Sequence, residues 1–142
     1  MLAILGLGAL GFAIFGVQWL ADPAAMAQPL GILLTNGDAT SDARAVYGGL
    51  EIGFGLFLAY SAWSPARRTQ GLAAGALVLG GLGLARIAGV LLAPGGAGHA
   101  TSMLLITDLT GITLFVVAFL VSRRVDQQQQ QQQQQQHQHQ PR

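Results

Sequence analysis

Long apolar runs separated by short polar stretches dominate the chain. Four of these runs, at about 1–20, 46–63, 71–92 and 102–121, are long enough to cross a bilayer. A helix of about 20 residues, at a rise of about 1.5 Å each, covers the roughly 30 Å of hydrocarbon. The pattern therefore predicts an all-α polytopic membrane protein, with four transmembrane helices in an antiparallel bundle that forms one domain over residues 1–122.

The polar stretches between and after these runs carry turn-forming or low-complexity sequence. Residues 22–45 contain Pro23, Pro29 and the run TNGD at 35–38, so a loop is expected there. The tail at 123–142 is rich in Gln and has little apolar surface to bury, which predicts a disordered tail on the cytoplasmic side.

The first apolar run has a second interpretation, which is a secretory signal. Small residues around Met26 resemble a cleavage site. The run itself is longer than the apolar core of a signal, and neither Lys nor Arg precedes it. These two features favour a retained first span.

Composition excludes several classes of protein. Charged residues make up 9% of the 142 residues, whereas a soluble domain carries about 25%. Cys is absent, which removes disulfides, thiolate chemistry and Cys-ligated metals. The formal charge of +1 offers no basic surface for nucleic acid. Motifs for nucleotides, catalytic triads or zinc are missing, so no cofactor, metal site or catalytic residue is expected, and nothing positive indicates an enzyme.

The arginines predict an orientation. One arginine pair follows the second span at 67–68, and another follows the fourth span at 123–124. With four spans, both pairs fall on one side, opposite the acidic loop at 22–45. The positive-inside rule then places both termini in the cytoplasm of a bacterial inner-membrane protein.

Three charged residues lie inside the predicted spans, namely Glu51, Arg86 and Asp108. Counted inward from the outer end of its span, Glu51 lies about 7 Å deep, and Arg86 and Asp108 each lie about 9 Å deep. Three helices of alternating direction therefore bring these side chains to one depth. Charges inside a bilayer are costly and usually face protein or water, so we expect an intramembrane polar layer.

Neighbouring residues indicate how the layer is supported. Tyr47 and Arg44 lie one and two turns before Glu51, on the same helix face. From there Tyr47 can donate a hydrogen bond to Glu51, and the long stem of Arg44 can reach inward. With Arg44 the charges of the layer balance; without it, one of the two acids tends to be neutral. Small residues let membrane helices approach closely, which predicts helix-packing roles for seven glycines: Gly48, Gly49, Gly53, Gly55, Gly83, Gly89 and Gly111.

Two functional hypotheses follow from the layer. In the first, Arg86 pairs with Glu51 or Asp108 and fixes helix register, in a scaffold or accessory subunit. In the second, Glu51, Arg86 and Asp108 form a polar site for translocation of a small solute or a proton. The expected partners are the lipid bilayer and either another membrane protein or further copies of this chain.

Two runs of sequence resemble a known family. RAVYGGLEIGFGLF at 44–57 and GGLGLAR at 80–86 are similar to DUF4345, small bacterial four-helix membrane proteins of uncharacterised function. The resemblance covers about 1–121 and implies topology and location, but no reaction. The family usually carries Glu in the fourth span, so Asp108 keeps the charge with a shorter reach. DoxX-like proteins are more loosely similar, which adds a quinone-linked redox partner as a weaker alternative; fold alone transfers no activity.

Overall fold

The computed structural model describes residues 1–92 and 98–138, with side chains through residue 135, and these residues form helices and short connections. Four helical segments are long and apolar enough to cross a membrane, which confirms the predicted all-α, four-span architecture. The elements are α1 (Leu2–Ala21), α2 (Pro23–Ala27), η1 (Gln28–Leu30), α3 (Gly37–Ala43), η2 (Arg44–Gly49), α4 (Leu50–Trp63), α5 (Pro65–Leu92) and α6 (His99–Gln138).

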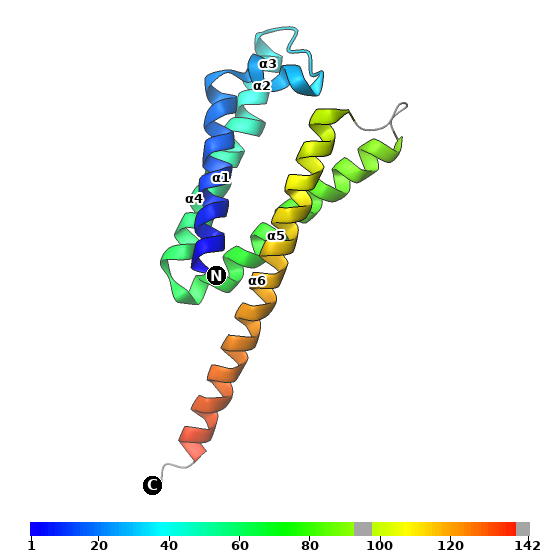
Figure 1. Ribbon diagram of the computed structural model, residues 1–142. Coiled ribbons are helices and arrows are strands. Elements are labelled where there is room, and N and C mark those ends of the chain that lie inside the picture. Colours follow the sequence, from blue (N-terminus) through cyan, green and yellow to red (C-terminus); the bar gives the residue numbers. More distant parts are fainter. Residues whose placement is uncertain (93–97, 139–142) are drawn as a thin grey trace.

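The long helices form two antiparallel pairs. α1 packs along α4, and α5 packs along α6, while contacts between the two pairs are fewer. Figure 1 shows α5 leaning away from α1 and α4 toward the end that carries α2 and α3. At that end the short η1 segment touches α6. The molecule is therefore two helix hairpins joined mainly through α4 and α5.

A small apolar core joins the two pairs. Leu5, Leu58 and Leu72 are fully buried, and Phe115 is 4% exposed. The Phe115 ring lies against Gly8 of α1 and Gly75 of α5, where a methyl group would collide with it. Burial of a Leu or Phe side chain stabilises a fold by about 1.5–3 kcal/mol in water. Between helices in lipid, van der Waals contacts stabilise the packing instead, and small residues allow the helices to come close enough to make them.

The α1–α4 pair packs through backbone rather than through large side chains. A methyl group on Gly16 would lie 2.7 Å from the Gly48 carbonyl oxygen, and one on Gly55 would lie 2.8 Å from the Ala9 carbonyl oxygen. Neither backbone atom can move without displacing its helix. Glycine is therefore required where these two helices cross.

The second span begins earlier than the sequence predicts. α3, η2 and α4 form one helical segment from Gly37 to Trp63, whereas a loop to residue 45 was expected. Asn36 starts this segment because its side-chain oxygen accepts a hydrogen bond from the Ala39 amide at 2.8 Å. Asn is common both in turns and at the N-cap of helices. Its presence in the sequence therefore does not show whether a loop continues or a helix begins.

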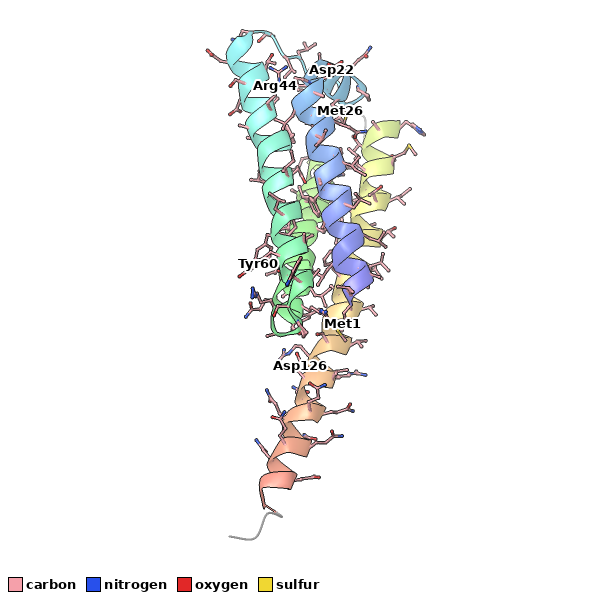
Figure 2. All side chains as sticks on the ribbon, turned by 90° about the vertical axis from the view of Figure 1, so that its left-hand side faces the viewer. Met1, Asp22, Met26, Arg44, Tyr60 and Asp126 are labelled. Carbon is pink, nitrogen blue, oxygen red and sulfur yellow. The ribbon has the colours of Figure 1, made fainter. Side chains whose placement is uncertain are left out.

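The end of α6 also differs from the expectation. The helix continues through the Gln tract to Gln138, where the sequence predicts a disordered tail. Side chains at 123–135 are all exposed, and this part of α6 extends beyond the other helices (Figures 1 and 2). Gln has a good helix propensity, and a helix that already exists needs no new nucleus to grow. The extension therefore depends on local propensity and not on tertiary packing.

Candidate functional site

The ion pair between Arg86 and Asp108 joins α5 to α6. The Arg86 Nε donates a hydrogen bond to Asp108 Oδ2 at 2.8 Å, and the two side chains are 24% and 9% exposed. Gly83 lies one turn before Arg86 and faces the same partner helix, since a methyl group there would lie 3.7 Å from the Asp108 Cβ. The glycine lets α6 come close enough for the shorter Asp side chain to reach the guanidinium.

Glu51 comes to the same level from the other helix pair. Gly16 of α1 packs against Gly48 and Ile52, which bracket Glu51 on α4. Gly8 of α1 packs against Phe115 of α6. Because α1 and α6 are antiparallel, moving from Gly8 to Gly16 along α1 corresponds to moving from Phe115 back to about Asp108 on α6.

Within the described part of the chain, Glu51 has no counter-charge. Its side chain is buried, at 9% exposure. The ion pair found among the described residues is the one between Arg86 and Asp108, and no side-chain hydrogen bond to Glu51 is found there. Two carboxylates and one guanidinium lie at about this level, so the three groups carry one more negative than positive charge when all are ionised.

Arg44 does not supply the missing charge. Its Nε donates a hydrogen bond to the Leu20 carbonyl oxygen at 3.1 Å, at the C-terminal end of α1. That carbonyl is one of the last four of the helix, which have no partner within it, and a cation there also interacts favourably with the helix dipole. The structure therefore directs Arg44 away from the layer, toward the end of α1.

Tyr47 is also placed differently from the expectation. Its ring stacks on Trp19 of α1, with centroids 4.5 Å apart and an interplanar angle of 28°. The reason is the π-helical turn η2, in which the Leu50 amide bonds to the Ala45 carbonyl, five residues back. Such a turn rotates the preceding residues away from the face expected for a regular α-helix. The Tyr47 side chain therefore packs on Trp19 of α1 and does not point toward Glu51.

The seven glycines divide into two groups. Gly48 and Gly55 lie against α1, and Gly83 and Gly111 lie in the contact between α5 and α6. A methyl group on the other three would meet little: only the Arg44 carbonyl oxygen at 3.9 Å for Gly49, and nothing within 4 Å for Gly53 and Gly89. Close packing is therefore observed at four of the seven positions.

Trp19, near the C-terminal end of α1, is buried. It is 1% exposed, and its indole Nε1 has no hydrogen-bond partner. It packs with Ala27 and Ala43, and partly buried apolar residues of the α1–α4 connection surround them: Phe15, Met26, Leu30 and Leu34. The sequence feature that indicates this burial is the apolar run at 30–34, whose Leu30 and Leu34 pack against the cluster that contains Trp19.

A polar cluster lies at the opposite end of the molecule. The Thr69 hydroxyl of α5 lies 2.5 Å from the Ser122 hydroxyl of α6 and donates to Asp126 Oδ2 at 2.9 Å. Ser122 is 2% exposed. Beside this cluster the Arg67 guanidinium covers the Tyr60 ring at 4.2 Å. These contacts fix the start of α5 against the end of the fourth span.

Two observations on the described residues concern metal and ligand binding. They contain no group of three His, Cys, Asp or Glu side chains able to hold a metal ion. A shallow groove on α6 is lined by Leu109, Thr110, Thr113 and Leu114. The hydroxyls of Thr110 and Thr113 donate to carbonyls one turn back in the same helix, so they are already satisfied.

Comparison with known proteins adds one finding. A family model described as a domain of unknown function, DUF4345, matches residues 1–119. No curated protein and no solved structure matches the chain. The match covers the first three spans and most of the fourth, including Glu51, Arg86 and Asp108, and it ends before the Gln tract.

Proposed function

The chain belongs to the DUF4345 family, a family of unknown function, and from that premise we propose that it is a membrane scaffold or accessory subunit with a structural charge layer. The observation that carries this proposal is the ion pair between Arg86 and Asp108 at 2.8 Å. It links two helices that otherwise meet through apolar and small side chains and, toward the far end of α6, through the hydrogen bonds of Thr69 with Ser122 and Asp126. A buried pair of this kind sets the register between helices more than it adds stability.

The outer surface of the helices is apolar, as expected for a subunit that packs against lipid or another membrane protein. Large apolar side chains are exposed along every long helix, among them Leu7 on α1, Leu56 on α4 and Leu77 on α5. A lipid bilayer covers such side chains, and so does another membrane protein or a second copy of this chain. The proposed partners are therefore lipid and a membrane-protein assembly.

Location and orientation are part of the same proposal. The end where α4 meets α5 carries four arginines, at 67–68 and 123–124, against Asp126. The opposite end carries three acids and Arg44; Figure 2 shows Asp22 and Arg44 there and Met1, Tyr60 and Asp126 toward the first end. By the positive-inside rule, both termini and the tail at 123–142 lie in the cytoplasm, beneath a transmembrane domain in a bacterial inner membrane.

A double-mutant cycle tests the structural role of the pair. Arg86→Ala leaves Asp108 buried without its counter-charge, which destabilises the fold by about 3 kcal/mol, the low end for a broken buried pair because Arg86 is partly exposed. Arg86→Ala/Asp108→Ala removes both charges, and we expect it to restore much of the folded yield in detergent. The measurement is the folded fraction by size-exclusion chromatography. A double variant no better than Arg86→Ala alone argues against a structural pair.

A second candidate function is translocation of a proton or small solute. The buried Glu51 carboxyl, which lacks a counter-charge among the described residues, favours it. This function requires a pH-dependent flux in liposomes that Glu51→Gln removes. Equal flux in empty liposomes and in liposomes with the protein would end this candidate and leave the scaffold proposal intact.

A further inference from the structure

One buried polar atom near the α2–α3 end lacks a hydrogen-bond partner in the described structure, and a glutamate near it makes no ion pair there. The Trp19 indole Nε1 is buried and donates to no acceptor. Glu51 is 9% exposed as a residue and makes no ion pair among the described residues. Buried polar groups are nearly always hydrogen-bonded, so an exception requires an explanation. One group is a donor and the other an acceptor, and they come from two helices in direct contact.

The contacts between α1 and α4 bring these groups to neighbouring levels. Gly16 packs against Gly48 and Ile52, which bracket Glu51. Trp19 lies three residues beyond Gly16 and stacks on Tyr47. The indole is thus within about one helical turn, or about 5.4 Å of rise, of the residue that carries the carboxyl. A glutamate side chain, with two methylene groups, spans such a distance.

The ionisable groups around Glu51 carry one more negative than positive charge when all are ionised. α1 contributes no ionisable side chain, α5 contributes Arg86, and α6 contributes Asp108, which is bonded to Arg86. On its own segment, Arg44 is bonded to the Leu20 carbonyl. Three further acids, Asp22, Asp38 and Asp42, lie in the α1–α4 connection and on α3, and add negative charge at this end. A net negative charge at this depth in lipid is costly.

A proton is the smallest ligand that neutralises this layer. A metal cation needs several oxygen or nitrogen ligands, and no group of three His, Cys, Asp or Glu ligands occurs in the described structure. We propose that Glu51 is a proton-binding site, and that its ionised form accepts a hydrogen bond from Trp19 Nε1. Protonation neutralises the layer and releases the indole; loss of the proton restores the negative charge, which the indole N–H then stabilises.

This site is independent of the proposed scaffold role and of translocation. It requires only that one proton bind and leave from water on the α2–α3 side. Its test therefore measures binding and not flux. A failure of the Arg86–Asp108 cycle would leave it unaffected, because that cycle concerns the other two charges.

Tryptophan fluorescence gives the first test. The chain has two tryptophans, and Trp63 is 89% exposed, so Trp63→Phe leaves Trp19 as the single indole. In nanodiscs, we expect the emission of this variant to change with pH in one transition that involves one proton. Adding Glu51→Gln should abolish the transition. Adding Asp38→Asn, a matched removal of an acid on exposed α3, should retain it. A transition that survives Glu51→Gln, or none in the Trp63→Phe protein, overturns the proposal.

Infrared difference spectroscopy gives a second test that does not need the Glu51 variant to fold. The C=O band of a protonated carboxyl should appear as the pH falls. A hydrogen bond to the ionised form favours that form, so Trp19→Phe should move the midpoint of this band to higher pH. An unchanged midpoint in folded Trp19→Phe protein would show that the indole does not hold the carboxylate, and the proposal would be wrong.

Discussion

At the residue scale, two glycines of α4 that are two positions apart have opposite surroundings. A methyl group on Gly55 would lie 2.8 Å from the Ala9 carbonyl oxygen and 3.2 Å from the Ala13 amide nitrogen, both of which are backbone atoms of α1. A methyl group on Gly53 would meet nothing within 4 Å. The sequence places both residues in the same span and marks both as packing glycines. Only their direction relative to α1 separates them.

We therefore expect Gly55→Ala and Gly53→Ala to differ in sign. Gly55→Ala forces α1 and α4 apart and should lower stability by about 1–3 kcal/mol, as overpacking does. Gly53→Ala should be neutral or stabilising by up to about 1 kcal/mol, because Ala favours helix more than Gly does. Thermal unfolding in detergent measures both. Equal destabilisation by the two variants would show that the α1–α4 crossing differs from the one described.

At the element scale, the second span is one helical segment with a change of geometry inside it. Asn36 caps its start, and the π-helical turn Arg44–Gly49 lies just before Glu51. The turn rotates α3 relative to α4, which places Tyr47 on Trp19 and directs Arg44 to the end of α1. A regular α-helix from Gly37 to Trp63 would instead have aligned both side chains with Glu51, as the sequence predicted.

The cap at Asn36 has a measurable consequence. Its side chain satisfies the Ala39 amide, so Asn36→Ala should destabilise the first turns of α3 by about 1 kcal/mol. Hydrogen exchange at residues 38–43 should speed up roughly fivefold, the ratio that corresponds to about 1 kcal/mol. Thr35→Ala, one residue earlier and outside the helix, is the matched control and should leave exchange unchanged. Equal effects of the two changes would place the start of the helix elsewhere.

At the scale of the whole molecule, the two helix pairs are held together at one end. The apolar core around Phe115 joins the two pairs and lies toward the end where α4 meets α5. The Thr69–Ser122–Asp126 cluster lies at the same end and joins α5 to α6 within one pair. The ends also differ in charge, with arginines at one and acids at the other. The two ends of the molecule therefore differ, and the proposed orientation is based on the difference in their charge.

Single cysteines can test this orientation, because the natural chain has none. In intact bacterial cells, a membrane-impermeant maleimide should label Thr35→Cys, at the α2–α3 end. It should label Ala66→Cys and Gln130→Cys only after the cells are permeabilised. Leu7→Cys, 68% exposed in the structure but facing lipid, should stay unlabelled in both cases because the reaction needs a thiolate in water. Labelling of Ala66→Cys in intact cells would invert the proposed orientation.

Several features of this protein were decided by local sequence alone. Hydropathy over about 20 residues is a local property, so the four spans and the all-α class followed from the pattern of apolar residues. Counting residues along spans of alternating direction also predicts a shared depth for Glu51, Arg86 and Asp108, and this stays a prediction. The sequence likewise placed the seven glycines within the spans, but it did not show which of them face a neighbouring helix.

Only the tertiary structure decided which of these residues meet. The sequence left Arg86 a choice between Glu51 and Asp108, and the packing of α5 on α6 joins it to Asp108. The π-helical turn moved Tyr47 and Arg44 off the face of Glu51, and the α1–α4 connection buried Trp19. The physical reason is that depth in a membrane depends on position along one helix, whereas a partner depends on rotation, tilt and crossing distance, which are set jointly by helices far apart in the chain.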